Sequence, residues 1–530
     1  MNNKVETDTY SNENSSIDQS LQKFASSGII NLSGTFLGMI LGFLVTLIIA
    51  RFYGPKVFGE YSVMISFLDL FVVIGLLGID QSIVRLIAYH KTQNQIEKVN
   101  SYIRFSFFIT IFSGFLIFIL LFNLSDFIGM NLLKLNSSFP IKLISIAIPF
   151  YINIYILSAI FRGFKRIKEK VFFLEVFKNL TFLFLILILI LLNISYDILF
   201  ILLVLSIMST SISFILYFFY KKPDLIKLSW EFHGSQGKKL LYFSFPLFVF
   251  TIMQRLIGKL GIFILQFYHS SKMVGLYNTA FFLGGFISII SAAFLYIYTP
   301  LASELYGEQR IQDMKKFYTI ITKWISILTL PFVAILIFYP ETIVTFLYGE
   351  KYLDATKSIQ IIGLGSLLGM IMGPSGATIT AMGKIKSLMW YSIFIVILNF
   401  FLNIILIPIF DIEGAAFAYI ISIIILNLFK SMKIFFDNKI HSIKQEVFFP
   451  IILTLLFIVF FNFLLNLFRI LVLIWMIPII YLIFIFLFGL SLLTTNNIKE
   501  EDLVIISIIE KSLGLNLDFL RRITKKLLKS

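Results

Sequence analysis

The chain has 530 residues, of which 58% are hydrophobic and 14% are charged, and its formal net charge is +15. Soluble proteins average about 45–50% apolar and about 25% charged residues, so this composition indicates a membrane protein. The absence of Cys excludes disulfides and thiolate metal ligands, and the four His residues lack the spacing of a zinc site. The basic residues flank apolar segments and do not form one face with interleaved aromatic residues, which argues against nucleic-acid binding.

The apolar segments predict an all-α polytopic membrane protein with about 14 transmembrane helices, since a helix needs about 20 apolar residues to cross a bilayer. In chain order the expected spans are centred at Leu41, Leu68, Thr110, Tyr151, Leu183, Val204, Thr251, Ile287, Leu328, Leu368, Ile397, Ile424, Phe457 and Ile480. Residues 1–23 are polar, lack the apolar core of a signal peptide, and are expected to form a disordered cytoplasmic tail. Residues 499–530 are expected to form an amphipathic cytoplasmic tail that either lies on the anionic inner leaflet or is solvated.

The placement of Lys and Arg predicts the orientation of the chain. Loops after even-numbered spans hold 25 of these residues, and loops after odd-numbered spans hold 8. Because cytoplasmic loops of membrane proteins carry the excess of Lys and Arg, the even-numbered loops and both termini are expected on the cytoplasmic side of the cell membrane.

One sequence pattern occurs twice, with the second copy starting 215 residues after the first. Residues 52–61 have the sequence FYGPKVFGEY, and residues 267–277 have the sequence FYHSSKMVGLY. Six expected spans separate the copies, so both run in the same direction and form parallel repeats related by an axis along the membrane normal. We therefore expect a six-helix N-lobe over residues 24–220, a six-helix C-lobe over residues 238–436, and two extra helices over residues 447–490.

Span seven carries three polar side chains, Gln254, Arg255 and Lys259, that we expect to bind substrate. Arg255 lies 12 residues before Phe267, which places it about 18 Å from the outer end of the span at ~1.5 Å per residue. Lys259 lies one turn further along the same face. The two cations either line a hydrated space and bind an anion such as a phosphate, or form a buried set that a neighbouring helix satisfies.

Asp69 in span two lies at a similar depth and is the expected charge partner of these cations. Three roles are open for its carboxylate. It pairs with one of the two cations until substrate binds that cation, or it binds a coupling ion, H⁺ or Na⁺, or it stays protonated and forms a hydrogen bond with a neighbouring helix. Asp80 and Arg85, near the cytoplasmic end of the same span, are expected to form an interfacial ion pair. Asn31 in span one either binds substrate or ties two helices together.

Two further polar pairs lie one helical turn apart. Glu175 and Lys178 are expected to form an ion pair at the cytoplasmic end of span five. Asn399 and Asn403 in span eleven either face a cavity or tie helices together, which is a common use of Asn in membranes.

Glycines mark two of the expected spans. In span one, Gly34, Gly38 and Gly42 have the small-xxx-small spacing that permits close helix approach. In span ten, a run of glycines with one proline predicts a kinked helix that can change shape: Gly363, Gly365, Gly369, Gly373, Pro374 and Gly376. Static packing is the alternative explanation for both sets of glycines.

Several short segments carry a resemblance to a known family. They are Ala50–Pro55 with Phe58–Tyr61, Gly78–Asp80 with Arg85, Val274–Tyr277, Leu347–Tyr352, Ala381–Lys384 and Glu413–Ala416. In their order and spacing, which cover about residues 25–490, the chain resembles the Wzx-like polysaccharide biosynthesis flippases of the multidrug/oligosaccharidyl-lipid/polysaccharide (MOP) exporter superfamily.

The resemblance implies a V-shaped, two-lobed helical bundle that works by alternating access. It implies a flippase for a polyprenyl-diphosphate-linked oligosaccharide, whose sugar head crosses from the inner to the outer leaflet while its lipid tail stays in the bilayer. Membrane lipids and polysaccharide assembly enzymes are the partners that it implies. Family members often carry an Asp late in span seven, about where this chain has Gly261.

Two other classes of function compete with a flippase. An ion-coupled multidrug or organic-ion exporter of the same superfamily would favour acidic residues at its substrate site. The charged pair that lies deepest in the spans of this chain, Arg255 with Lys259, is basic. A membrane glycan polymerase or glycosyltransferase would need positioned acids, and the one external acidic doublet, Asp411 with Glu413, lies in a tight turn. Walker and G-x-S-x-G motifs are absent from the sequence, so we expect a transporter without a cofactor and without direct ATP coupling, and no enzyme.

Overall fold

The computed structural model describes residues 2–135, 137–193, 196–221, 234–441, 445–495 and 497. All of its regular elements in these ranges are helices, so the predicted all-α class is confirmed. In chain order they are α1 (Asn2–Leu76), α2 (Ile79–Thr92), α3 (Ile96–Asn123), η1 (Phe127–Leu132), α4 (Phe139–Gly163), α5 (Ile167–Lys170), η2 (Val171–Phe177), α6 (Lys178–Leu191), η3 (Tyr196–Ile198), α7 (Leu199–Lys221), α8 (Gly234–Tyr268), α9 (Ser271–Gly307), α10 (Ile311–Phe338), α11 (Pro340–Leu347), η5 (Glu350–Ala355), α12 (Thr356–Ile371), α13 (Ser375–Ala381), α14 (Ile385–Asn438), α15 (Gln445–Leu467), η6 (Ile474–Met476) and α16 (Ile477–Thr494).

Eleven helices of the described chain are long and apolar enough to cross a membrane, or twelve if α12 and α13 together count as one bent span. Two of them contain a residue with non-helical backbone angles, Gly54 (φ 80°, ψ 178°) in α1 and Asp411 (φ 47°, ψ −123°) in α14. A straight helix of the 54 residues in α14 would be about 80 Å long, far more than the ~30 Å of a hydrocarbon core. Each of these helices therefore turns at its non-helical residue. The exact count of fourteen spans stays a prediction.

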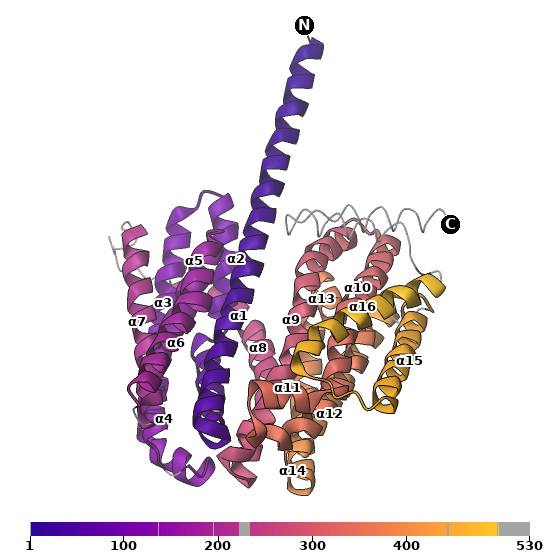
Figure 1. The fold of residues 1–530 in the computed structure, drawn as a ribbon. Coiled ribbons are helices and arrows are strands. Elements are labelled where there is room, and N and C mark those ends of the chain that lie inside the picture. The colour runs from indigo at the N-terminus through magenta and orange to yellow at the C-terminus, as the bar shows by residue number, and fades with distance from the viewer. Residues whose placement is uncertain are drawn as a thin grey trace.

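The start of α1 differs from the expected disordered tail over residues 1–23, because the helix begins at Asn2. The sequence has neither Gly nor Pro before Gly28, so no residue of this segment interrupts a helix that continues from span one. Figure 1 shows this part of α1 extending beyond the other helices. The expected amphipathic tail over residues 499–530 lies outside the described residues.

The helices form two groups that meet at one end of the molecule (Figure 1). The group α1–α7 lies on one side and the group α8–α14 on the other, with α15 and α16 at the edge of the second group. We call the end that holds the turn at Gly54 and the turn between α8 and α9 the outer end, because the charge distribution predicts that it faces outside. The two groups have the arrangement expected for two repeats, although the lobe boundaries stay predictions.

Span one packs closely against span five through its glycines, as their spacing predicts. A Cβ atom added at Gly34 would lie 2.0 Å from a methyl carbon of Val171, and one added at Gly38 would lie 2.9 Å from the carbonyl oxygen of Glu175. Asn179 in α6 donates a hydrogen bond of 3.1 Å to the carbonyl oxygen of Gly38. The contact therefore depends on the absence of a side chain on this face of α1.

We expect the substitution Gly38→Ala to destabilise the protein by about 1–3 kcal/mol, the usual cost of overpacking a tight interior contact. Thermal unfolding of the detergent-solubilised protein measures this effect. The matched control is Gly285→Ala, since a Cβ atom at Gly285 has no neighbour within 4 Å. Equal unfolding midpoints for the two variants would contradict the close contact.

Span ten is broken, as its run of glycines predicts. The segments Glu350–Ile371 and Ser375–Ala381 are bent by 42° at the break between them. Gly373 has φ +64°, a conformation that glycine adopts without strain. Tyr318 in α10 donates a hydrogen bond of 2.6 Å to the carbonyl oxygen of Met372, which replaces a helical partner that the break removes.

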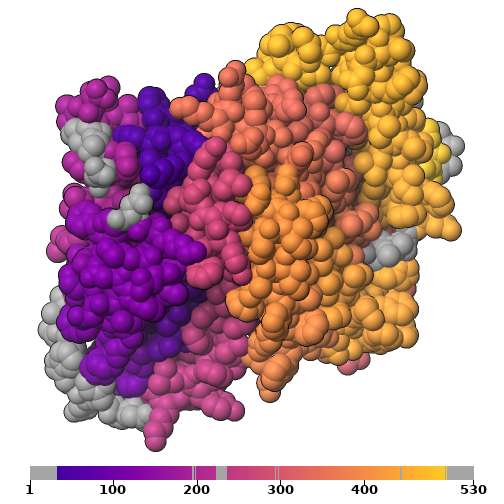
Figure 2. Space-filling view, turned by 90° about the horizontal axis from the view of Figure 1, so that it is seen from below, coloured from indigo at the N-terminus to yellow at the C-terminus, as the bar shows by residue number. Residues whose placement is uncertain are grey.

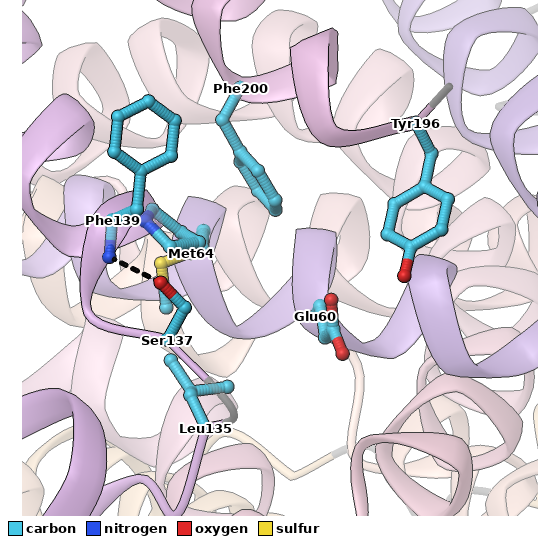
Figure 3. A pocket seen from close by; sticks show the side chains of 8 residues that line it. Glu60, Met64, Leu135, Ser137, Phe139, Tyr196 and Phe200 are labelled. Atoms are coloured by element: carbon cyan, nitrogen blue, oxygen red, sulfur yellow. Dashed lines mark hydrogen bonds between the residues drawn. The ribbon is translucent and has the colours of Figure 1, made fainter.

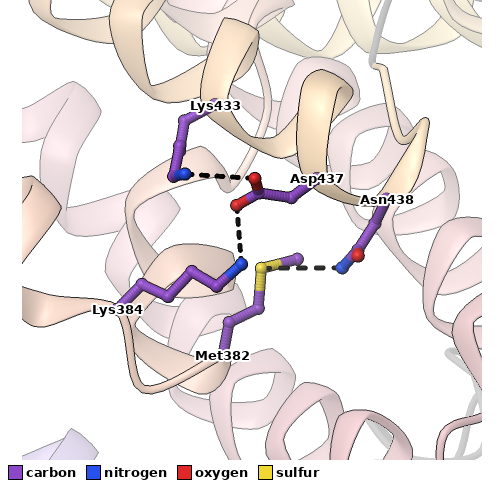
Figure 4. Close-up of polar contacts among 5 residues, drawn as sticks. All are labelled: Met382, Lys384, Lys433, Asp437 and Asn438. Carbon is purple, nitrogen blue, oxygen red and sulfur yellow. Dashed lines mark hydrogen bonds and ion pairs between the residues drawn. The ribbon is translucent and has the colours of Figure 1, made fainter.

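The inner end of the second group is held by a cluster of charges (Figure 4). Lys384, just before α14, contacts the carboxylate of Asp437 at 2.7 Å, and Lys433 contacts the other oxygen of the same carboxylate at 3.1 Å. Asn438 lies close by and contacts the sulfur of Met382 at 3.7 Å. These contacts fasten the loop after α13 to the end of α14.

Candidate functional site

A polar cluster lies between the two groups of helices. Arg255 and Lys259 come from α8, and Asp69 comes from the second half of α1. Asp69 interacts electrostatically with both cations, and the two cations also interact with each other. The structure thus brings together the three charges that the sequence placed at a similar depth.

Two tyrosines of α4 complete this polar cluster, which we define as Asp69, Tyr151, Tyr155, Arg255 and Lys259. Both Tyr151 and Tyr155 interact electrostatically with Asp69 and Arg255. Their rings are 5.1 Å apart. Neither tyrosine was predicted from the sequence, although two tyrosines four residues apart share one face of a helix, and this spacing is a signal for a polar face on span four.

The charged members of the polar cluster are accessible although they lie deep in the helices. Arg255 is exposed, and Asp69 and Lys259 are partly exposed. An ionised side chain in contact with hydrocarbon would be costly, and α1, α4 and α8 surround this set. The side chains therefore border a space between helices, and the planar fork of Arg255 together with the ammonium of Lys259 can hold an anion there.

Lys178 of α6 extends this set, contrary to the expected ion pair with Glu175. Its ammonium donates a hydrogen bond of 3.0 Å to the hydroxyl of Tyr151 and lies 4.9 Å from the centre of that ring. Glu175 instead pairs with Lys170 at 2.9 Å. The expected pair was wrong because η2 is a π-helix, whose wider turn moves residues three apart off a common face.

Gln254 and Asn31 were the other expected substrate ligands. Gln254 donates a hydrogen bond of 2.8 Å to the hydroxyl of Ser392, so it ties α8 to α14, although its neighbour Arg255 belongs to the polar cluster. The side chain of Asn31 lies outside the described ones, and its role stays a prediction.

The expected ion pair between Asp80 and Arg85 is not formed. Asp80 interacts with Arg162 and Arg255, and Arg162 donates a hydrogen bond of 3.2 Å to the carbonyl oxygen of Asp80. Arg85 lies over the ring of Phe243 at 5.1 Å. The prediction was wrong because residues five apart point about 140° away from each other on a helix with 3.6 residues per turn. Asp80 therefore lies near the polar cluster, and Arg85 contacts α8.

The two asparagines of span eleven tie helices together. Asn399 and Asn403 are both 1% exposed. Asn399 donates to the carbonyl oxygen of Ala418 at 3.1 Å and to the hydroxyl of Ser422 at 3.0 Å, and Asn403 donates to the side-chain oxygen of Asn399 at 3.1 Å. A Cβ atom at Gly261 would lie 3.3 Å from the side-chain oxygen of Asn403, so Gly261 of α8 faces these asparagines.

The two copies of the repeated sequence meet at the outer end. A Cβ atom at Gly59 would lie 1.6 Å from the carbonyl oxygen of Ser271, and a Cβ atom at Gly275 would lie 2.0 Å from the carbonyl oxygen of Pro55. Such close backbone contact requires glycine in both copies. Figure 2 views this end and shows atoms of the two groups in contact across it.

Side chains around these glycines add hydrogen bonds between the two groups. Tyr352 donates to the carbonyl oxygen of Ala50 at 2.9 Å, and Asn278 donates to the hydroxyl of Ser62 at 2.7 Å. Arg51 donates to the carbonyl oxygen of Leu347 at 3.2 Å. The outer end is therefore closed in this structure, and we call Gly59, Gly275 and these hydrogen bonds the outer contact.

Comparison with known proteins agrees with this arrangement. Residues 24–306 match the family described as polysaccharide biosynthesis protein. An uncharacterized membrane protein of Methanocaldococcus jannaschii is 22% identical over 425 residues, which are 77% of this chain and 83% of that protein.

Two solved structures share the fold. The lipid II flippase MurJ in an inward closed conformation is 18% identical, with a TM-score of 0.67 over 90% of this chain and 100% of that chain. An inward-facing multidrug resistance transporter of the MATE family of the MOP superfamily is 15% identical, with a TM-score of 0.63 over 77% of this chain and 98% of that chain. The resemblance found in the sequence is confirmed, and the chain belongs to the polysaccharide biosynthesis protein family, with the fold of the MOP superfamily.

Proposed function

We propose that the chain is a flippase that moves a polyprenyl-diphosphate-linked oligosaccharide from the inner to the outer leaflet by alternating access. The observation that carries this proposal is the polar cluster, in which the accessible cations Arg255 and Lys259 of α8 interact with Asp69 of α1. Membership of the polysaccharide biosynthesis family supports a glycan as cargo.

The chemistry of the polar cluster suits a diphosphate. Arg255 offers a planar fork of donors that matches two phosphate oxygens, and Lys259 adds a compact positive charge. In the empty state Asp69 balances part of this charge. When a diphosphate binds, it takes the place of Asp69 as the counter-charge, and the released carboxylate is free to bind a coupling ion, H⁺ or Na⁺.

The outer contact sets the side from which cargo enters. With Gly59 and Gly275 in contact, the head group has access to the polar cluster from the inner end. Exposed apolar side chains on α1, including Phe36 (54% exposed) and Leu37 (46% exposed), leave an apolar surface beside this route for the lipid tail. Opening the outer contact would then release the head to the opposite leaflet.

A drug exporter of the same superfamily is the second candidate. It would neutralise organic cations with acidic residues, whereas the polar cluster has two cations and one carboxylate. The basic excess therefore favours an anionic cargo. We place the protein in the cell membrane with both termini in the cytoplasm, and polysaccharide assembly enzymes are its proposed partners.

The role of Asp69 gives a testable prediction. We expect Asp69→Asn to retain binding of lipid-linked oligosaccharide but to reduce translocation by about tenfold or more, because the neutral amide cannot exchange with the diphosphate or hold a coupling cation. Binding and transport are measured on the same purified protein in proteoliposomes. Wild-type transport by this variant would assign Asp69 a structural role only.

The experiment that tests the function is deletion of the gene, followed by leaflet analysis of the lipid-linked glycan. A flippase leaves complete precursor on the inner leaflet when it is lost. A precursor that stops growing would instead support a polymerase or glycosyltransferase, and an unchanged distribution would contradict the proposal.

A further inference from the structure

A lysine of the second group of helices, Lys430, lies outside the polar cluster and near the inner boundary of the membrane. It belongs to the part of α14 that follows the turn at Asp411. Lys430 comes 19 residues after Asp411, which places it about 28 Å from the outer end of this span at ~1.5 Å per residue. Because a hydrocarbon core is about 30 Å thick, Lys430 lies at the depth of the inner-leaflet headgroups.

The ammonium of Lys430 has no counter-charge among the residues that the structure describes. Its polar contact there is a long hydrogen bond of 3.4 Å to the side-chain oxygen of Asn427, which is neutral. Two other lysines at this end, Lys384 and Lys433, both contact the carboxylate of Asp437 (Figure 4). A charge at a membrane boundary without a partner is unfavourable, so the position of Lys430 favours a bound anion.

Span ten presents glycines to this part of α14. A Cβ atom at Gly376 would lie 3.8 Å from Nζ of Lys430, and one at Gly369 would lie 3.4 Å from Nδ2 of Asn427. No side chain of span ten therefore covers the ammonium or the amide at these two positions. Lys430, Asn427 and both glycines are partly exposed, so a small ligand has access to the two side chains.

The two side chains of α14 offer hydrogen-bond donors of the kind that bind phosphate. The ammonium of Lys430 is a compact positive charge, and phosphate oxygens accept short, charge-assisted hydrogen bonds from such a group. The Nδ2 amide nitrogen of Asn427 donates no hydrogen bond within the described residues, which leaves it available as a second donor. Ser431 next to them donates to the carbonyl oxygen of Met372 at 3.5 Å and holds α14 against the break in span ten.

We propose that Lys430 and Asn427 bind a phosphate group at the inner boundary of the second group of helices, with the ammonium as its counter-charge and the amide as a second donor. Phosphate has two sources at this depth, the headgroup of an inner-leaflet lipid or a soluble phosphate of the cytoplasm. The site does not depend on the proposed flippase function, because it shares no residue with the polar cluster and its occupancy is measured without transport.

The test measures binding of two probes to the full-length protein. One is inorganic pyrophosphate in detergent solution, and the other is phosphatidic acid in phosphatidylcholine nanodiscs. Because the polar cluster also offers cations, all variants are made in the Arg255→Ala protein, which serves as the parent. We expect Lys430→Gln to weaken binding about tenfold or more, since a charge-assisted contact is lost. Asn427→Ala should weaken binding about threefold, the size of one neutral hydrogen bond. Lys439→Gln removes an exposed cation at the same end and should bind like the parent.

The pattern of binding separates the two sources of phosphate. Saturable binding of phosphatidic acid alone assigns a lipid headgroup, whereas binding of pyrophosphate assigns a soluble phosphate as sufficient. The proposal is overturned if the parent binds neither probe, if Lys430→Gln and Lys439→Gln bind equally, or if oleate, an anionic lipid without phosphate, binds as tightly as phosphatidic acid. Asn427→Ala keeps the test decisive if Lys430→Gln fails to fold, because unchanged binding by this variant also contradicts the site.

Discussion

Replacing Arg255 by Ala is expected to reduce translocation of lipid-linked oligosaccharide about 100-fold or more while the protein still inserts into the membrane. The substitution removes the planar fork of the polar cluster and with it a cation that interacts with Asp69, Tyr151 and Tyr155. Each hydrogen bond to a charged group contributes about 1.5–3 kcal/mol, and 1.4 kcal/mol corresponds to about tenfold. Loss of a two-bond contact therefore predicts the stated reduction.

Two further variants locate the origin of this effect. Arg255→Lys keeps the charge but loses the fork, and we expect an intermediate loss of about tenfold. Lys351→Ala removes an exposed cation at the outer end and should transport at the wild-type rate. Transport is measured in proteoliposomes at matched protein levels. If Arg255→Ala and Lys351→Ala transported equally, the assignment of an anionic head group to the polar cluster would be wrong.

The second large effect is expected at the outer contact. Gly59→Ala and Gly275→Ala each place a methyl group within 2.0 Å of a backbone carbonyl oxygen of the opposite group. A backbone atom cannot rotate away as a side chain can, so the two groups must separate at this end. A penalty of about 3 kcal/mol would shift the balance between closed and open outer ends about 100-fold, and transport should be abolished because one of the alternating states is lost.

The cysteine-free chain provides a direct measurement of this opening. Ser62 is 4% exposed and bonds across the contact, so a single Ser62→Cys reporter should be shielded from a membrane-impermeant thiol reagent. In the Gly59→Ala background the same reporter should become labelled. Gly285→Ala is the matched control, since a Cβ atom there has no neighbour within 4 Å. Shielding that is unchanged in the Gly59→Ala background would show that the outer contact tolerates a side chain.

Patterns along one helix were predictable from the sequence. Each of these patterns depends only on residues close together in the chain, and the structure has all of them. They are the long apolar segments, the duplicated turn at residues 52–61 and 267–277, the glycine spacing around Gly38 and the break at Gly373. The similar depth of Arg255, Lys259 and Asp69 also follows from the helix rise alone. In the structure these three side chains interact with one another.

Contacts between helices were not predictable in the same way. Tyr151 and Tyr155 join the polar cluster only because α4 packs beside α1 and α8. Which helices are neighbours cannot be deduced from the sequence of any one of them. Two ion pairs were expected within single helices. Glu175 and Lys178 would share a face only in a regular α-helix, and Asp80 and Arg85 would have to meet across five residues of one helix. A π-helix displaced the first pair, and a competing guanidinium from Arg162 took the place of the partner in the second.

The two copies of the repeated sequence contact each other in the structure. Gly59 and Gly275 occupy corresponding positions, and the structure places them against each other where the two groups meet. The next residues differ, since Leu276 fills the core while Glu60 lines a cavity. The same turn therefore closes the outer end in both copies, and in the first copy it also lines a cavity (Figure 3).

The central claim is that the polar cluster carries an anionic, lipid-linked glycan head across the membrane. Its most direct test is a leaflet assay in proteoliposomes, in which a fluorescent polyprenyl-diphosphate oligosaccharide is followed as it becomes accessible to an impermeant sugar-modifying enzyme. The wild-type protein should expose the substrate, and Arg255→Ala should leave it protected. Protection in the wild type, or equal exposure by Arg255→Ala, would contradict the account.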